Sequence, residues 1–329
     1  MASATLSEPQ RYLEAQIRWR PLEIAFWLAT LLPFVLTPNH LALASQIAIT
    51  ALFALSLDLI LGYAGIISLG HAAYFGFGSY TAGLIAKWGW GEPLTGLLIA
   101  AAAAGALGYV TSFIIARFRH LALIMITLGL GLLLAEAANS AGWLTGGADG
   151  LQGVRMWKLL GLFQFDLYGT AAYTYSLVVL FLGFLLARRL INSPFGLALR
   201  GIRENAVRMP AIGAPSPAHI RKAYTIAAVM AGIAGALLAQ TTETVSLDTL
   251  SFQRSADVLV ILILGGAGRL YGGIVGAIIY MVARDQFSRI NPQYWYFWIG
   301  TLLIAVVLFL PNGILGGMAR LVRLERRAA

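Results

Sequence analysis

The sequence lacks cysteine and has little charge. Without cysteine, disulfide bonds, zinc–thiolate sites and thiol nucleophiles are excluded. Charged residues make up 11% of the 329 residues, against roughly 25% in soluble domains. None of the three lysines is followed by serine or threonine, so there is no phosphate-binding P-loop, and neither HExxH nor Gly-x-Ser-x-Gly occurs. The chain therefore carries no motif of an ATPase, a metalloprotease or a serine hydrolase.

The chain is instead rich in apolar residues, at 59% of the sequence. This composition predicts an all-α polytopic membrane protein rather than a soluble one. The net charge of +9 would suit nucleic acid, but lysine and arginine on cytoplasmic loops explain it better, so no nucleic-acid partner is expected. Residues 1–20 are polar and mixed in charge, which indicates no cleavable signal.

Apolar runs predict about ten transmembrane or re-entrant helices within a membrane domain at 22–311. A cytoplasmic segment (1–21) precedes this domain and a cytoplasmic tail (312–329) follows it. A run of 255–265 is shorter than the roughly 20 residues of a full span, so a re-entrant helix is expected there. The predicted spans are 22–36, 41–61, 66–86, 94–116, 121–140, 173–187, 223–241, 255–265, 271–283 and 294–310.

The basic residues predict the orientation. With ten spans and the N-terminus inside, 17 of the 23 lysines and arginines fall on the cytoplasmic side. Both termini are then cytoplasmic, 141–172 is a periplasmic loop and 188–222 is a basic cytoplasmic segment. Two inverted five-helix halves are one arrangement of ten spans, although the glycine interruptions at 62–65 and 265–273 occupy offset positions in the two halves.

The most informative stretch reads DLILGYAGIISLGHAAYFGFGSYT, from Asp58 to Thr81. It is apolar enough for a membrane, yet it contains glycines, hydroxyl side chains, a carboxylate and an imidazole. Polar or broken helix at membrane depth survives only inside protein or along a water-filled cavity. The stretch thus predicts one wall of a translocation route, formed by Asp58, Gly62, Tyr63, Gly65, Ser68, Gly70, His71 and Ser79.

The ionisable residues of the spans have more than one interpretation. His71 either hydrogen-bonds backbone at the glycine break or contacts substrate, and Asp58, which flanks the same break, is a possible partner for it. Glu136 and Asp257 lie near the ends of spans, where solvation explains them. No metal-ligand cluster and no catalytic residue is predicted.

A second glycine-rich segment, LGGAGRLYGGIVGA, interrupts the later spans. Spacings of four residues are typical of helix packing in an apolar segment, and a substrate path along the same face is the sharper alternative. We therefore expect helix contacts at Gly265, Gly268, Gly272 and Gly276.

The segment SPFGLALRGIREN, at 193–205, alternates apolar and charged residues at helical spacing. It predicts a short amphipathic helix on the cytoplasmic face. Either this is an ordinary basic loop, or it is a docking helix for a cytosolic protein. The docking candidates are Phe195, Gly196, Arg200, Arg203, Glu204 and Asn205.

These blocks occur in the order GYAGIISLGHAAYFGFGSYTAGL, LTGGADGL, SPFGLALRGIREN, LGGAGRLYGGIVGA and FLPNGILGG. Over roughly residues 40–317 the chain resembles the permease subunit of branched-chain amino acid ABC importers, the second of two paired permeases. It departs from the common family pattern at Ile66, where an amide is frequent, at Asp58, where asparagine is common, and at Gly273, where proline is frequent. Pro210 would also stop or kink the coupling helix.

The resemblance implies a multi-pass subunit of the bacterial cytoplasmic (inner) membrane that is not itself an enzyme. It implies a heterodimer with a second permease, two cytosolic ABC ATPase subunits and a periplasmic solute-binding protein. Magnesium-ATP would be bound by the ATPases and no cofactor by this chain, while 193–213 resembles the region that transmits ATP-driven closure. Urea, short amides and aromatic acids are alternative solutes in the same family.

A function of another class stays open on the residues alone. A proton-coupled secondary transporter would use Asp58 and His71 as a proton relay and would need no ATPase. It predicts uptake driven by a proton gradient, with a pH dependence that mutation of Asp58 abolishes.

Overall fold

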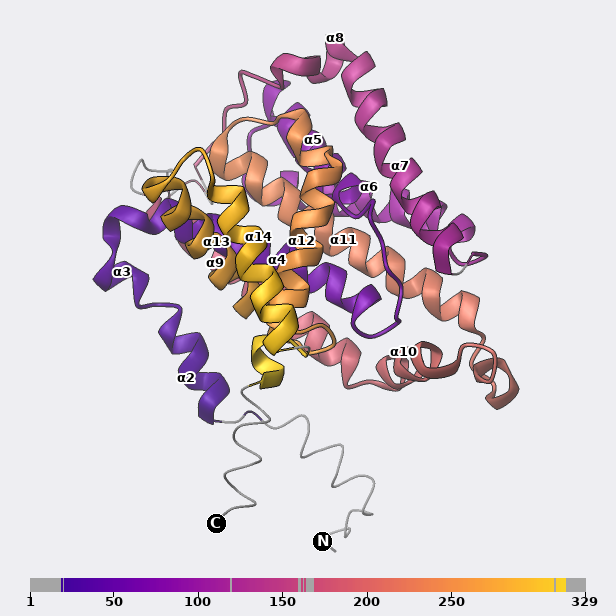
Figure 1. Cartoon of the computed structure of the whole chain (residues 1–329). Helices are drawn as coiled ribbons and strands as arrows, with labels where there is room; N and C mark the ends of the chain where they lie inside the picture. Colours follow the sequence, from indigo (N-terminus) through magenta and orange to yellow (C-terminus); the bar gives the residue numbers. More distant parts are fainter. Residues whose placement is uncertain are drawn as a thin grey trace, which may run out of the picture.

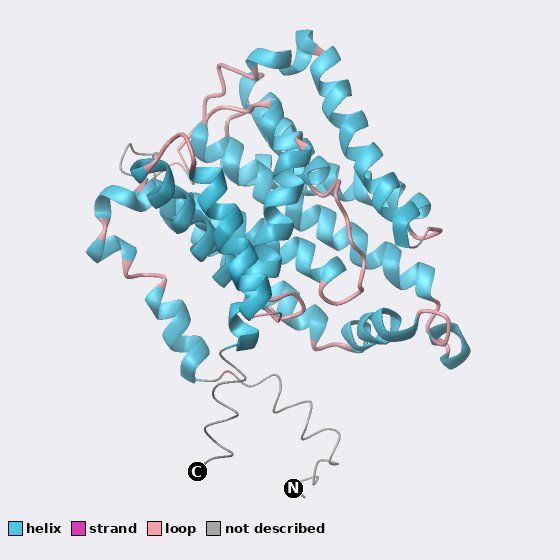
Figure 2. Cartoon of the chain, in the orientation of Figure 1, coloured by secondary structure: helices cyan, strands magenta, loops and turns pink. Residues whose placement is uncertain are grey.

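The computed structural model describes residue 19 and residues 21–118, 120–158, 161, 163, 169–310 and 312–317. Every regular element in these ranges is a helix, and one isolated antiparallel bridge joins Leu151 to Val245 (Figure 2). The all-α prediction is therefore confirmed for this part of the chain. The predicted tails, 1–21 and 312–329, fall mostly outside it.

Most helices follow the apolar runs of the sequence, and Figure 1 shows how they are arranged. In chain order they are α2 (Pro21–Ala29), α3 (Pro33–Leu36), η1 (Pro38–His40), α4 (Leu41–Leu61), α5 (Ala72–Lys87), α6 (Pro93–Ile115), α7 (His120–Ser140), α8 (Gly142–Thr145), η2 (Gly147–Asp149), α9 (Thr170–Ile191), α10 (Pro194–Asn205), η3 (Met209–Ile212), α11 (Ser216–Thr242), η4 (Leu247–Leu250), α12 (Phe252–Gly265), α13 (Gly272–Ile290) and α14 (Trp295–Phe309).

Six of the described helices are long and apolar enough to cross a membrane. Three of the other predicted spans are shorter or interrupted: the first divides into α2 and α3 before Pro33, α5 has 16 residues and α12 has 14. The fourth corresponds to α13, which has 19 residues but is not among the six. The expected count of ten is thus not reached by length and composition. The six candidates are Pro38–Leu61, Pro93–Ile115, His120–Ser140, Thr170–Ile191, Ser216–Thr242 and Trp295–Gly317.

The helices α4 and α11 form the core of the bundle. Most residues of α4 are buried, and α11 packs on α4, α5 and α6. Small residues permit these contacts: a side chain at Gly78 would collide with the backbone of Gly232, and one at Gly235 with the carbonyl of Phe75. Close approach of backbones maximises van der Waals contact, which drives helix association where lipid removes the hydrophobic difference.

The helix α7 lies at the edge of the bundle (Figure 1) and buries only Leu123, Thr127 and Gly131.

The N-terminus of α6 is capped by Glu92, whose carboxylate accepts hydrogen bonds from the N–H groups of Thr95 (2.6 Å) and Leu94 (3.3 Å). Partial burial raises the pKa of Glu92, but the hydrogen bonds outweigh it and the pKa lies below its usual value.

Candidate functional site

The chain leaves helical conformation between α4 and α5, at residues 62–71. Gly65 takes a positive φ of 72° there, which favours glycine. Side chains satisfy the backbone freed by the break: Leu69 N–H donates to Thr127 Oγ1 (3.2 Å) and Ala72 N–H donates to Ser255 Oγ (2.9 Å). The break predicted from Gly62 and Gly65 is therefore present, although α5 begins six residues later than the expected span.

Asp58 connects this first break to a second one, the turn between α12 and α13. Its side chain is 1% exposed, and its Oδ1 accepts a hydrogen bond of 2.7 Å from the N–H of Gly268. Gly268 lies in the turn between α12 and α13 with a φ of 77°, so it is outside the helix in which equal glycine spacing had placed it. The three glycines at the α12–α13 contact are Gly265, Gly272 and Gly276, where added side chains would collide with the backbone of the facing helix.

The amphipathic helix α10 rests on the same junction. The guanidinium of Arg203 donates to the carbonyl of Gly62, and its aliphatic carbons lie against Gly65. One turn earlier, Arg200 lies 5.4 Å from the ring centroid of Tyr63. The helix α10 thus contacts the first break through both arginines and, through Gly62 and Asp58, is linked to the second.

The other docking candidates have different surroundings. The ring of Phe195 stacks on His219 with centroids 5.9 Å apart, and Gly196 packs on the carbonyl of Ile191. Asn205 Oδ1 accepts from two N–H groups of the following turn, each at 3.1 Å. Glu204 is exposed. Arg203 and Glu204 are both exposed, but of the two only Arg203 forms a hydrogen bond with the first break among the described residues.

His71 is fully buried and does not contact Asp58 as a hydrogen-bonding partner, so the pair suggested by the sequence does not form. Its ring stacks on Phe53 (5.4 Å, 5°), and Nε2 lies 2.8 Å from Ser56 Oγ. Ser56 donates its own proton to the Phe53 carbonyl (2.6 Å), so Nε2 carries the hydrogen that His71 donates. Nδ1 has no hydrogen-bonding partner among the described residues.

The remaining residues of the predicted wall lie in the protein interior. Ser68 Oγ is 3.3 Å from the hydroxyl of Tyr224, Gly70 packs on the backbone of Thr127, and Ser79 is buried with its hydroxyl unpaired within the described residues. Most of the stretch packs between α4, α7 and α11, while Ala64, Gly65, Ile66 and Ile67 line a cavity of about 340 Å³ together with residues of α7 and α10. Its role in a translocation route stays a prediction.

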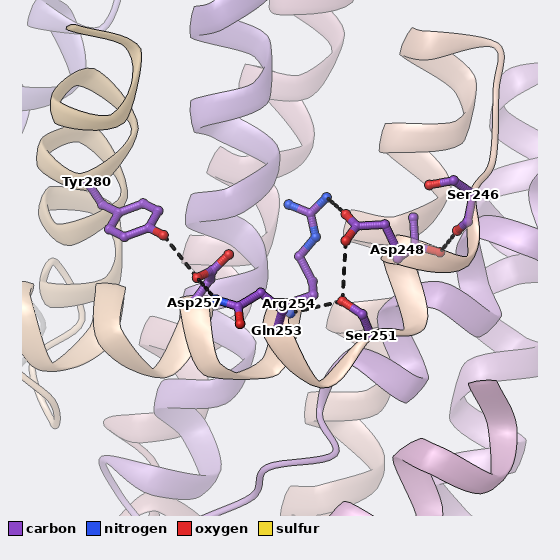
Figure 3. Close-up of polar contacts among 8 residues, drawn as sticks. Ser246, Asp248, Ser251, Gln253, Arg254, Asp257 and Tyr280 are labelled. Carbon is purple, nitrogen blue, oxygen red and sulfur yellow. Dashed lines mark hydrogen bonds and ion pairs between the residues drawn. The ribbon is translucent and has the colours of Figure 1, made fainter. Parts of the chain in front are cut away.

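A polar cluster that the sequence did not reveal lies on η4 and α12 (Figure 3). Arg254 Nη2 forms a 3.0 Å ion pair with Asp248 Oδ2, and the N–H of Arg254 donates to Ser251 Oγ (3.2 Å). Asp257 Oδ1 accepts from Gln253 (3.1 Å) and from the hydroxyl of Tyr280 on α13 (3.0 Å). The sequence placed 242–254 between two predicted spans and explained Asp257 as a solvated helix end. The missed signal was opposite charges three residues apart in a helix too short to be a plain span.

The polar cluster lies at the level of the middle of α4. A cavity of about 20 Å³ is bordered by Arg254, Asp257 and Tyr280 together with Thr50 and Phe53 of α4. Phe53 and Thr50 precede the last residue of α4 by eight and eleven positions, or about 12 and 17 Å at 1.5 Å per residue. Since α4 is as long as the roughly 30 Å bilayer core, these charges are near its midplane.

Long apolar helices, two interrupted helices and charges inside the bundle define a multi-pass membrane protein. Sequence comparison gives its family. The profile described as "Branched-chain amino acid transport system / permease component" matches residues 39–307, and the chain belongs to this family of transport permeases.

Relatives agree with this assignment. The chain is 28% identical to the high-affinity branched-chain amino acid transport system permease protein LivM of Escherichia coli (strain K12), over 92% of this chain and 76% of the relative. It is 25% identical to the LivH permease protein of Salmonella typhimurium, over 81% and 91%. No solved structure matches the chain. The protein is therefore a permease subunit of the ABC importer type, as the sequence motifs predicted.

Proposed function

We propose that the chain is one of two paired permeases of an ATP-driven importer in the bacterial cytoplasmic membrane. The solute is a branched-chain amino acid or a related small molecule delivered by a periplasmic binding protein. Two ATPase subunits bind magnesium-ATP and dock on α10, and both termini lie on the side of α10. The names of the relatives and the excess of basic residues on that side support this arrangement.

The observation that carries the proposal is the contact of α10 with the first helix break. An amphipathic helix outside the bundle donates a hydrogen bond from Arg203 to Gly62, and Asp58 extends the connection to Gly268. A displacement of α10 by ATP-driven closure would therefore reach both interrupted helices. Closure changes the conformational equilibrium only if ATPase docking differs in free energy between the two permease conformations.

The test uses the assembled transporter in proteoliposomes. Alanine at Arg200, Arg203 and Glu204 together should leave ATP hydrolysis measurable while uptake of labelled leucine falls at least tenfold. The matched control replaces two exposed charges outside α10, Glu136→Gln and Lys87→Gln, and should transport normally. Normal transport by the triple variant would contradict coupling through α10.

A second arm tests the class of transporter. Purification from the native membrane should recover a second permease and P-loop ATPases with this chain. Recovery of the chain alone, with uptake driven by a proton gradient, would overturn the importer assignment. The ligand of the co-purified binding protein then decides between amino acids and the alternative solutes, urea, short amides and aromatic acids.

A further inference from the structure

The polar cluster on η4 and α12 places charge where lipid cannot solvate it. The side chains of Arg254 and Asp248 are 25% and 63% exposed, and Asp257 is partly exposed. Arg254 and Asp257 border the cavity at the level of the middle of α4. A charged residue at the bilayer centre faces a bundle interior or a water-filled cavity rather than lipid. The exposed edge of the cluster therefore faces an aqueous path or the second permease.

The backbone leading to the cluster supports the same location. Residues 245–250 run beside α5: Val245 packs at Gly83 and Leu250 at Gly76, which are separated by seven residues of that helix. The segment contains no α-helix; its one regular element is the short 3₁₀ turn η4. Irregular backbone at membrane depth is tolerated where it is buried in protein or lines a cavity. The segment thus brings Asp248 and Arg254 into the bundle from one end.

The cluster has hydrogen-bonding capacity left over. Arg254 uses one side-chain nitrogen for Asp248, and its Nε is buried without a hydrogen-bonding partner among the described residues. Asp257 accepts the hydrogen bonds of Gln253 and Tyr280 on Oδ1, and no hydrogen bond within the described ranges uses Oδ2. A purely internal network would pair Arg254 with Asp257, three residues apart on one helix face. In the structure each is held by another partner.

We propose that Arg254 and Asp257 form a binding site for the head group of an α-amino acid, Arg254 for the carboxylate and Asp257 for the ammonium. This assignment rests on the proposed function and adds the residues that recognise the solute. A guanidinium presents two parallel N–H groups to a carboxylate, and a carboxylate oxygen accepts from an ammonium. A zwitterion engages both residues, whereas an amine or a keto acid offers one charge and engages one residue.

The neighbours of the pair suit this solute. Phe53, Phe75, Ile261 and Met281 border the small cavity beside the two charges and are buried, so an aliphatic side chain would contact them only once that cavity opens. The cavity has room for about one water molecule in this conformation, so the amino acid binds at the exposed edge of the pair. Asp248 forms an ion pair with Arg254, and the solute carboxylate would replace or join it.

The test measures direct binding to the purified permease pair by saturation-transfer NMR, without the binding protein or ATP. The three probes are leucine, α-ketoisocaproate, which lacks the ammonium, and isopentylamine, which lacks the carboxylate. The variants are Arg254→Gln and Asp257→Asn. The control variants Glu136→Gln and Lys87→Gln change exposed charges away from the cluster.

We expect leucine binding to weaken roughly tenfold or more in each cluster variant, since each loses a charge-assisted hydrogen bond. Binding of α-ketoisocaproate should depend on Arg254 alone, and binding of isopentylamine on Asp257 alone. A structural role would change all three probes equally in each variant. That pattern, no leucine binding by the unmodified pair, or unchanged leucine binding in both variants would overturn the site.

ATP-driven leucine uptake by the unmodified complete importer separates this failure from failure of the proposed function. Uptake that persists while the NMR pattern fails refutes only the site. Absence of uptake refutes amino-acid import by the complex. Size-exclusion profiles of the two variants, together with retained binding of the one probe each should keep, show that the substitutions leave the fold intact.

Discussion

Gly62→Ala is the substitution that the structure constrains most closely. Gly62 has φ −70° and ψ −37°, a helical conformation open to any residue, so backbone freedom is not why glycine is needed. Space is the reason: an added Cβ would collide with Oδ1 of Asp58 and with the backbone of Gly268. To remove this collision the turn between α12 and α13 must move, because the colliding atoms include the backbone of Gly268.

The magnitude follows from two opposing terms. Alanine gains about 0.5–1 kcal/mol over glycine in helical backbone, whereas overpacking costs about 1–3 kcal/mol. Because the obstacle includes backbone, the upper part of that range, about 2–3 kcal/mol, applies, and a net destabilisation of about 1–2.5 kcal/mol is expected. The midpoint temperature of thermal unfolding of the purified chain in detergent should then fall by a few degrees. The control is Gly129→Ala on α7, where an added Cβ meets nothing within 4 Å. If Gly62→Ala unfolds at or above the wild-type temperature, the reasoning is refuted.

Three further substitutions test separate contacts. Asp58→Asn keeps an oxygen that accepts the Gly268 N–H, so ATP-driven uptake should fall less than about threefold, whereas Asp58→Ala should lower both uptake and Tm; equal loss would contradict this. Gly276→Leu should abolish the monodisperse size-exclusion peak, because its side chain would meet the α12 backbone; a normal peak would disprove that contact. The pKa of Glu92 is lowered in the folded chain, so the stability that its carboxylate contributes is present above the unfolded pKa of about 4.3 and is lost as pH falls through the folded pKa. Glu92→Gln should remove this part of the dependence of Tm on pH, and an unchanged dependence would contradict the stabilising role of the cap.

Much of the helical framework could be predicted because it depends on local properties of the chain. The predicted span 41–61 coincides with α4, and the predicted amphipathic segment 193–205 contains α10. Apolar length and helical spacing are read directly along a sequence. The proline at residue 33 and the glycines after Leu61 also act locally, and both interruptions lie near them.

Pairings between distant segments could not be predicted in the same way. Asp58 and Gly268 are 210 residues apart, and their hydrogen bond depends on how two turns pack. Proximity along the chain suggested His71 as the partner of Asp58, since both flank one break. Packing separates the two buried residues: His71 stacks on Phe53 inside the bundle, while Asp58 accepts a hydrogen bond from Gly268 in the turn between α12 and α13. Sequence reasoning identified the polar residues but not their partners.

The polar cluster shows why the location of a charge matters more than its presence. Arg254 and Asp257 lie near the end of an apolar run, where a sequence offers solvation as the simplest explanation. The return of residues 245–250 beside α5 carries that end to the level of Phe53 in mid-span, so solvation by bulk water no longer explains it. At that depth an unpaired charge costs free energy, roughly 2.5–3.5 kcal/mol on insertion scales. Arg254 is paired with the exposed Asp248 and Asp257 with the uncharged groups of Gln253 and Tyr280, and the head group of a zwitterionic solute offers each of the two residues an opposite charge.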